Sequence, residues 1–189
     1  MSESDEAYWN SFLPLLMERM GSMVRRSSSK VVSPYGLTSA HSYYLIALYL
    51  HNGQTMTDLS RFLDLDPANT NRIIKALKEK EFVYDDRKAE NSKKYSVFLT
   101  EPGMNLAKEI MEDNTNIMNA FFAGIPKEKI AVIRNTMIEA FQKIDPGLDR
   151  YLRYDMDDPY FMQLQQYVNR DFIAMPNIEK DDDSDGSGS

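Results

Sequence analysis

The chain has 189 residues, enough for one ordinary domain and an extension, and it contains no cysteine and only two histidines, His41 and His51. The lack of cysteine excludes disulfides, thiolate metal ligands and a cysteine nucleophile, and two histidines argue against a histidine-rich zinc site. No apolar run approaches the roughly 20 residues of a membrane-spanning helix. The acidic, polar start of the chain is unlike a signal peptide. We therefore expect a soluble, cytoplasmic protein.

The formal net charge of −7 is unusual for a protein that binds nucleic acid, but this charge is unevenly distributed. Residues 145–189 hold eleven acidic and four basic residues, whereas residues 1–144 hold eighteen of each. Within the neutral part, the segment Pro67 to Lys80 carries Arg72, Lys75, Lys78 and Lys80 against one acid, Glu79. This local excess of positive charge predicts a modest electrostatic footprint for an anionic partner.

The first half of the chain reads as a series of helices. Apolar residues at three- and four-residue intervals predict a helix over 6–26, in which Pro14 marks a kink or a later start. The polar segment 27–36 is expected to be a connector. Thr38 is expected to cap a helix over 39–51.

Two short helices are expected to follow in close succession. Thr57 is expected to cap the first, over about 58–63. Asp66 is expected to cap the second, with Pro67 in its first turn, where the missing N–H costs nothing. This second helix runs to about Lys80, and Ile73, Ile74 and Leu77 are expected to face inward.

The period then changes from helical to alternating, which predicts two strands over 82–84 and 95–99, joined by a polar hairpin tip over 85–94. Thr100 is expected to cap a long helix over 101–122, and a further helix is expected over 127–144. In the extension, 148–154 and 159–173 have helical patterns, and the acidic, Gly/Ser-rich segment 181–189 is expected to be disordered.

The order helix, short helix, helix, strand, turn, strand is that of a helix-turn-helix with a wing. A short helix braces a second helix, which fits the major groove of B-DNA, and the hairpin reaches the DNA backbone or the minor groove. The fold class that we expect is mainly α with a small β-wing: a winged helix-turn-helix with a helical dimerisation region.

The chain resembles the MarR family over roughly residues 37–144. The resemblance is carried by Leu37-Thr38, Leu45 and Leu48, by the run from Met56 to Leu77, and by the wing end from Val97 to Gly103. It implies a triangular homodimer in which the terminal helices intertwine and two winged lobes straddle a palindrome, with half-sites about one helical turn apart. The expected regions are 1–36 and 101–144 for dimerisation, 37–100 for DNA binding, 145–180 as an acidic helical extension and 181–189 as a tail.

Four positions depart from the pattern of that family. Asp85 stands where an arginine usually follows the first wing strand, and Asn91 and Lys93 replace the wing's acid and arginine. Asp64 replaces a glycine that is usual between the two short helices. We therefore expect the wing to lack its internal salt bridge, and its contact with DNA stays open.

The candidate DNA contacts lie on the second short helix, its neighbour and the wing. Asparagine pairs with adenine and arginine with guanine, which favours Asn69, Asn71 and Arg72 for base contacts. Phosphate contacts suit lysine and arginine. The alternative for any of these residues is an ordinary solvated surface. The complete set of expected DNA-facing residues is Thr57, Asn69, Thr70, Asn71, Arg72, Lys75, Arg87, Lys88, Lys93 and Lys94.

A small aromatic or phenolic effector is a further possibility that the resemblance implies, and Arg26, His41 and Tyr44 are the candidate contacts. His41 could instead make a hydrogen bond at a helix start, Tyr44 could be a core residue, and Arg26 could lie on the surface. Arg25 is a second candidate for an effector carboxylate.

The function that we expect is a sequence-specific regulator of transcription that binds double-stranded DNA as a homodimer, as a repressor that responds to a ligand. The alternative is a winged-helix module that binds proteins. A glycine-rich phosphate loop, a nucleophile elbow and metal-ligand spacing are all missing from the sequence, so neither an enzyme, a cofactor nor a metal site is expected.

Overall fold

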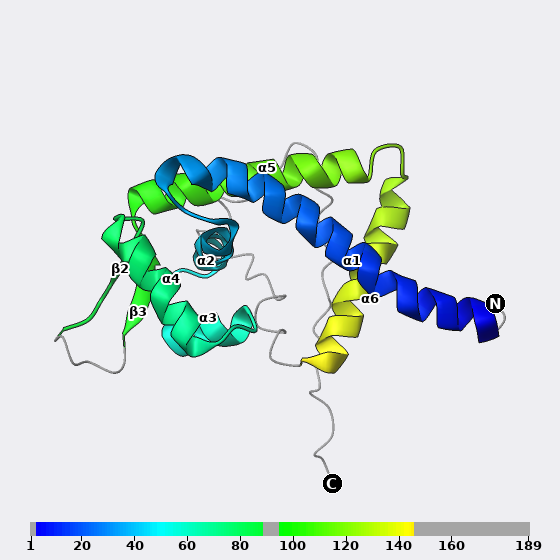
Figure 1. Ribbon diagram of the computed structural model, residues 1–189, viewed down its shortest axis with the longest axis horizontal. Helices are drawn as coiled ribbons and strands as arrows, with labels where there is room; N and C mark the ends of the chain where they lie inside the picture. The colour runs from blue at the N-terminus through cyan, green and yellow to red at the C-terminus, as the bar shows by residue number, and fades with distance from the viewer. Residues whose placement is uncertain (1–2, 89–94, 146–189) are drawn as a thin grey trace, which may run out of the picture.

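The computed structural model describes residues 3–88 and 95–145. These form a winged lobe and a long helical part (Figure 1). The lobe contains α2 (Ser39–Leu50), α3 (Met56–Phe62), α4 (Pro67–Glu79) and three short strands, β1 (Gln54–Thr55), β2 (Val83–Asp85) and β3 (Ser96–Leu99). The helical part consists of α1 (Glu3–Val32), α5 (Glu101–Phe121) and α6 (Lys127–Ile144), and a 3₁₀ turn, η1 (Ser33–Tyr35), follows α1. The mainly α fold with a small β-wing is therefore confirmed.

Helix α1 is longer than the sequence predicted. It passes Pro14 and continues through the segment assigned to a connector, as far as Val32. The reason lies in α5, since Ser27 Oγ donates to Asp113 Oδ1 at 2.9 Å and Ser28 Oγ donates to Asn114 Oδ1 at 3.4 Å. These polar side chains therefore hold α1 against α5 instead of ending the helix, and Figure 1 shows the two helices running side by side.

The core of the lobe surrounds α2. Tyr44, Leu45 and Leu48 of this helix are completely buried, and α2 packs against α1 and α5 on one side and α4 and β3 on the other. Tyr44, Leu45, Leu48 and Tyr49 thus belong to the core face of α2. Burial of this apolar surface, rather than the short helices' own propensity, stabilises the lobe.

The sheet is antiparallel with the strand order β1-β3-β2. β2 and β3 form the wing hairpin, in which Tyr84 lies opposite Phe98. The sequence analysis missed β1, which has only two residues and pairs Gln54 with Val97 and Thr55 with Ser96. A strand this short is defined by its partner, so its own residues carry no period that could reveal it.

The wing joins α5 at a tightly packed corner. Thr100 caps α5 as expected, since its Oγ1 accepts from the Gly103 N–H at 3.1 Å, and it also donates to the Glu81 carbonyl at 2.6 Å. A Cβ on Gly103 would lie 1.9 Å from the carbonyl oxygen of Phe82, so only glycine fits there. This corner fixes the direction in which α5 leaves the lobe.

The terminal part of α5 turns into α6 through residues 122–126, with Gly124 in the left-handed region at φ 78°. Among the described residues, no helix combines the length and apolar character needed to cross a membrane. The predicted helices over 148–154 and 159–173 and the tail over 181–189 lie outside the described residues.

Candidate nucleic-acid interface

Helix α4 presents one buried and one exposed face. Its first turn is fixed by Asp66, whose Oδ1 accepts from the N–H groups of Ala68 and Asn69 at 2.8 and 3.1 Å, and by Pro67 at the start, both as predicted. The buried stripe consists of Thr70, Ile73, Ile74 and Leu77. The three- and four-residue spacing of this stripe turns Asn71, Arg72 and Lys75 outward, where they are exposed.

In the turn before α4, Asp64 occupies the position where the family pattern has a glycine. Asp64 has a φ of 49°, in the left-handed region, which aspartate tolerates better than most residues. The Leu65 N–H donates to the Ser60 carbonyl at 2.9 Å and closes the end of α3. The departure from the family pattern at Asp64 therefore keeps the backbone geometry that the turn needs.

Helix α3 begins earlier than predicted. Thr55, and not Thr57, is the N-cap, since Thr55 Oγ1 accepts from the Asp58 N–H at 3.2 Å and donates to the Asp58 carboxylate at 2.7 Å. The assignment of Thr57 as the cap was wrong, because the reciprocal bonds with Asp58 select the residue three positions before it. Thr57 itself is exposed in the first turn of α3.

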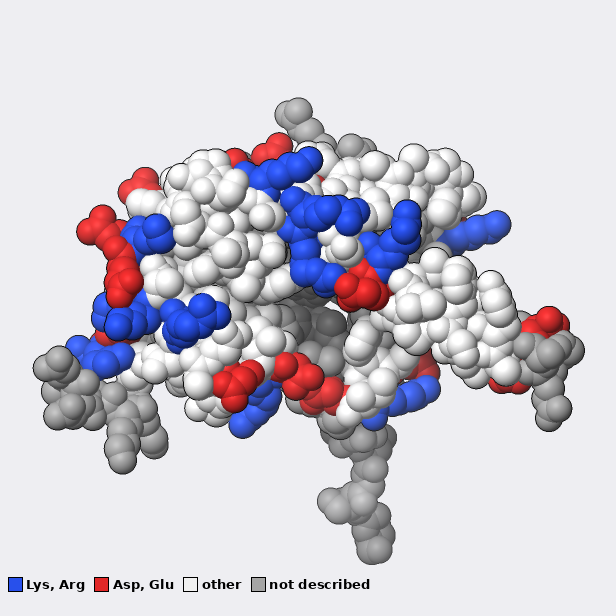
Figure 2. Space-filling model, viewed as in Figure 1, with Lys and Arg blue, Asp and Glu red and all other residues white. Residues whose placement is uncertain are grey.

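The basic side chains of α4 differ in how strongly they are already paired within the chain. Arg72 donates to Asn69 Oδ1 at 2.9 Å, so two predicted base-contacting residues contact each other on the surface. Lys75 is widely exposed and lies 3.9 Å from Glu79. Lys78, in contrast, is held at 2.7 Å by Asp85 of the wing. Figure 2 shows basic side chains over the end of the lobe that carries α4 and β2, with acidic ones beside them.

Asp85 organises the root of the wing. Its carboxylate is largely buried and pairs with Lys78 of α4 at 2.7 Å and with Arg87 at 3.5 Å. Burial raises the pKa of Asp85, but hydrogen bonds from the Lys78 ammonium and the Arg87 N–H outweigh burial and hold this pKa below its ordinary value. The residue that departs from the family pattern thus makes an ion-pair bridge between α4 and the wing.

The predicted phosphate contacts in the wing divide into three groups. Arg87 is half-buried at the root, where it pairs with Asp85 and its guanidinium carbon lies 4.0 Å from the centre of the Tyr95 ring. Lys88 is exposed. Lys93 and Lys94, like Asn91, lie outside the described residues. Arg87 is therefore placed to shape the wing rather than to extend from it.

Two of the predicted site residues are completely buried. Thr70 has 0% exposure, and its hydroxyl forms a 3.0 Å hydrogen bond with the hydroxyl of Tyr44, which also has 0% exposure. A buried hydroxyl cannot reach a base or a ligand, so Thr70 as a DNA contact and Tyr44 as an effector contact are corrected. Their burial follows from α2 and α4 packing together, which the helical period of one segment does not reveal.

His41 and Arg26 do not meet Tyr44 in one pocket. His41 Nδ1 accepts from the Thr38 N–H at 3.1 Å and caps α2, which is the helix-start alternative of the sequence analysis. Burial, with the nearby cations Arg72 and Lys80, lowers the pKa of His41. Arg26 lies on the surface of α1 and donates to Ser22 Oγ at 3.1 Å.

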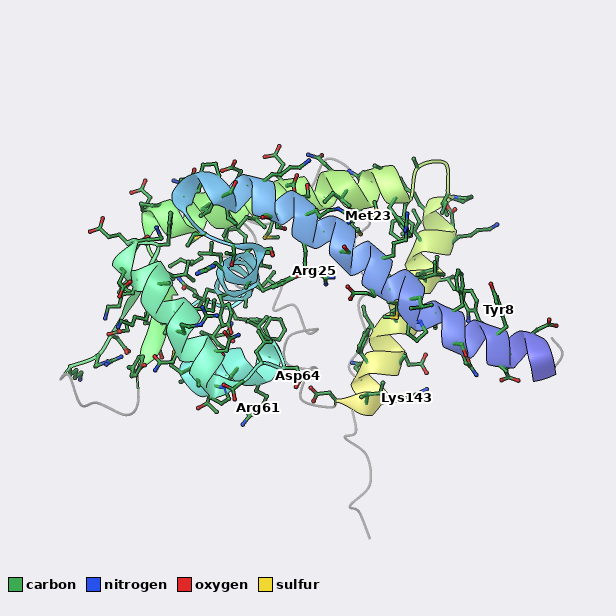
Figure 3. The ribbon with its side chains drawn as sticks, viewed as in Figure 1. Tyr8, Met23, Arg25, Arg61, Asp64 and Lys143 are labelled. Atoms are coloured by element: carbon green, nitrogen blue, oxygen red, sulfur yellow. The ribbon has the colours of Figure 1, made fainter. Side chains whose placement is uncertain are left out.

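Two side chains that the sequence analysis did not select are also exposed on the lobe. Arg61 lies on α3, and Figure 3 shows it near Asp64 on the outer edge where α3 meets α4. Tyr84 is 50% exposed and stacks on Phe98 with ring centres 5.4 Å apart. A basic residue in the last turn of a short bracing helix was the available signal for Arg61, whereas nothing in the sequence distinguished Tyr84 from a core strand residue.

The chain is similar to known regulators. A model of the MarR family matches residues 35–90. The HTH-type transcriptional regulator BilQ of Clostridioides difficile (strain CD3) is 26% identical over 99 residues, which cover 52% of this chain and 64% of BilQ, less than two thirds of that relative.

Solved structures share the fold over a larger part of the chain. A MarR transcriptional regulator from Methanosarcina mazei Go1 superimposes with a TM-score of 0.62 and 24% identity over 71% of this chain and 96% of that one. A MarR-family transcriptional regulator from Listeria monocytogenes, solved in complex with a 26mer DNA, has a TM-score of 0.56 and 21% identity over 74% of this chain and 89% of that one.

Proposed function

We propose that the chain is a member of the MarR family, whose model matches residues 35–90, and that it is a sequence-specific regulator of transcription that binds double-stranded DNA as a homodimer. The observation that carries the proposal is the exposed face of α4. This face presents Asn71, Arg72 and Lys75 on a helix whose opposite face is anchored in the core. A helix of this kind fits the major groove, which is about 12 Å wide.

The residues on this face suit two kinds of contact. Lys75 would neutralise a phosphate, and this type of contact supplies affinity without sequence preference. Arg72 and Asn71 would reach base edges, and Arg72 would exchange its contact with Asn69 for a guanine. Lys78 and Arg87 are already paired with Asp85 and would support the wing.

The dimer is supported by apolar side chains outside the lobe. On α6, Ile133, Phe141 and Ile144 are 47%, 43% and 80% exposed, and none of the residues of this helix is buried. Surfaces of this kind are typical of protein–protein contacts. A symmetric pair would present two α4 helices to a palindrome, with half-sites about one helical turn, roughly 34–36 Å, apart.

Repression and its release by a small aromatic or phenolic acid complete the proposal. Arg25 of α1 forms an ion pair with Glu18 and lies near Tyr43 of α2, and Figure 3 shows Arg25 projecting from α1 on the side where α2 lies. A guanidinium beside a phenol suits a carboxylate and a ring. Adding 4-hydroxybenzoate should weaken DNA binding by the natural protein but not by Arg25→Gln. An equal response in both proteins would contradict this site.

A salt titration tests the DNA-binding proposal. Fluorescence anisotropy would measure the affinity for a duplex selected from a random library, at several salt concentrations. Lys75→Gln should lower the slope of log K against log salt by about 0.9 for each phosphate contact that is lost. Lys78→Gln is the matched control, because the same residue type, one turn away, is already held by Asp85.

The outcomes separate the two candidate functions. Selection of a palindrome, a salt-dependent affinity and a smaller slope for Lys75→Gln alone support a DNA-binding regulator. If no duplex is selected and affinity for DNA is absent even at low salt, the proposal fails. In that case the protein-binding alternative gains weight.

A further inference from the structure

A buried polar contact joins the DNA-facing helix to the centre of the lobe. The hydroxyl of Tyr44 on α2 lies 3.0 Å from Oγ1 of Thr70 on α4, and both residues have 0% exposure. We infer that the Tyr44–Thr70 hydrogen bond is a specificity-determining contact, which sets the rotation of α4 and thereby the position of its base-reading side chains. This inference rests on the proposed DNA-binding function.

The other buried contacts of α4 with the core are apolar and constrain its rotation less sharply than a hydrogen bond does. Ile73, Ile74 and Leu77 are buried against apolar neighbours, and apolar contacts have no preferred direction. A hydrogen bond weakens steeply when its geometry departs from the optimum. The bond at Thr70 is therefore the directional contact among the four buried residues of α4.

Thr70 is adjacent in α4 to the residues that would contact bases, so its hydrogen bond affects their positions directly. Thr70 lies between Asn69 and Asn71 in the first turns of the helix, and Arg72 follows two residues later. Successive residues are separated by about 100° around a helix, so a small rotation at Thr70 moves the exposed side chains across the groove. The carboxyl-terminal turns, where Lys78 is held by Asp85, would move less.

Helix α2 is a firm reference for this bond. Leu45 and Leu48 are completely buried, and Gln54 Nε2 donates to the Ala47 carbonyl at 2.8 Å. The Tyr44 ring, itself fully buried, has a fixed place in this packing. Tyr44 therefore transmits the position of α2 to α4, which makes it a positioning residue that does not itself touch DNA.

Substitutions that remove one hydroxyl can separate positioning from folding. Tyr44→Phe and Thr70→Val keep the size of each side chain, and Thr70→Ser restores the hydroxyl. A threonine that loses its partner can bond to the carbonyl four residues earlier, so the fold should survive Tyr44→Phe. Ser42→Ala is the matched control, because it removes another buried hydroxyl of α2, which donates to the Ser39 carbonyl of its own helix instead of contacting α4.

The readout is the affinity ratio between the duplex that the natural protein selects from a random library and the same duplex with its most strongly selected base pair changed. We expect Tyr44→Phe and Thr70→Val each to lower this ratio about three- to tenfold, the effect of one neutral hydrogen bond, with an unchanged salt slope. The double variant should be no worse than the poorer single variant. Ser42→Ala and Thr70→Ser should keep most of the ratio.

A loss of stability alone would weaken binding to both duplexes equally and leave the ratio unchanged. Hydrogen exchange of the free protein gives a second readout, in which Tyr44→Phe should speed exchange in the first turns of α4 and Ser42→Ala should not. An unchanged ratio for Tyr44→Phe overturns the inference, whatever the exchange shows. If the natural protein itself selects no duplex, the proposed function fails, while the exchange still reports whether the bond positions α4.

Discussion

The winged lobe and α6 differ in how far their apolar residues are buried. Helix α4 in the lobe buries Thr70, Ile73, Ile74 and Leu77 against elements of its own chain. Helix α6 buries none of its residues, and Ile144 is 80% exposed although apolar residues recur along the helix at three- and four-residue intervals. The difference teaches that the lobe carries a complete core, whereas α6 carries an apolar face suited to a second surface.

The first half of α1 resembles α6 in this respect. Tyr8, Trp9 and Leu15 are 66%, 44% and 65% exposed, while Ser28 and Val32 near the other end of the same helix are buried. A single helix thus joins both kinds of surface. One part of α1 packs against the lobe, and the other part exposes the apolar side chains that the proposed dimer would use.

The largest effect should come from the lobe. Leu77→Ala removes a fully buried side chain from α4 and should lower the free energy of unfolding by about 2–5 kcal/mol, because it leaves a cavity in the core. Urea unfolding measures this value. Val132→Ala on α6, where the side chain is 64% exposed, is the control and should cost less than about 1 kcal/mol. Equal losses of unfolding free energy in the two variants would contradict the difference drawn between the lobe and α6.

A change on α6 should affect assembly more than folding. Phe141→Glu places a charge on the apolar face of α6 and should weaken self-association at least about tenfold, as charges in interface centres do. Sedimentation velocity over a concentration series measures this effect. Asn135→Glu introduces the same charge at an exposed polar position of α6 and should leave the association unchanged. A natural protein that stays monomeric throughout would refute the assembly role.

Inside the lobe, the ion pairs of Asp85 should contribute less than the core. Asp85→Asn should lower the free energy of unfolding by about 1 kcal/mol, since Lys78 and Arg87 lose their charged partner but remain partly solvated. Because the pKa of Asp85 is lowered on folding, its contribution is complete above the ordinary carboxyl pKa and declines as the pH falls below it. Glu79→Gln, which removes an exposed partner of Lys75, should have a smaller effect in the same unfolding experiment.

The smallest effect concerns His41. Folding lowers the pKa of this residue, so its contribution to stability is complete above the ordinary histidine pKa of about 6.5 and is lost as the pH falls from there through the folded-state pKa. Protonation would also turn the Nδ1 acceptor of the Thr38 N–H into a donor. The urea midpoint of the natural protein should therefore fall more between pH 7.5 and 5.5 than that of His41→Gln. A parallel fall in His41→Gln would contradict this assignment.

Local signals explain why parts of the fold were predictable. Asp66-Pro67 and Thr100 mark the starts of α4 and α5 with hydrogen bonds that span only a few residues. The inward direction of Ile73, Ile74 and Leu77 also follows from the helical period of one segment. Features whose causes lie within one or two turns of chain can be deduced from the sequence.

Features that depend on distant partners could not be deduced. The continuation of α1 to Val32 depends on Asp113 and Asn114, which are 86 residues away from the serines that bind them. The burial of Thr70 depends on Tyr44, 26 residues earlier. The same limit applies to the candidate site, since the pairing of Lys78 and Arg87 with Asp85 decides which cations are free.

Guanine methylation interference tests most directly the central claim that α4 enters the major groove. Methylation at guanine N7, which lies in that groove, should block binding at two patches about 10–10.5 base pairs apart, and Arg72→Ala should lose the interference at the guanine that Arg72 contacts. A complex that tolerates methylation at every guanine N7, but is blocked by methylation of adenine N3 in the minor groove, would contradict the account.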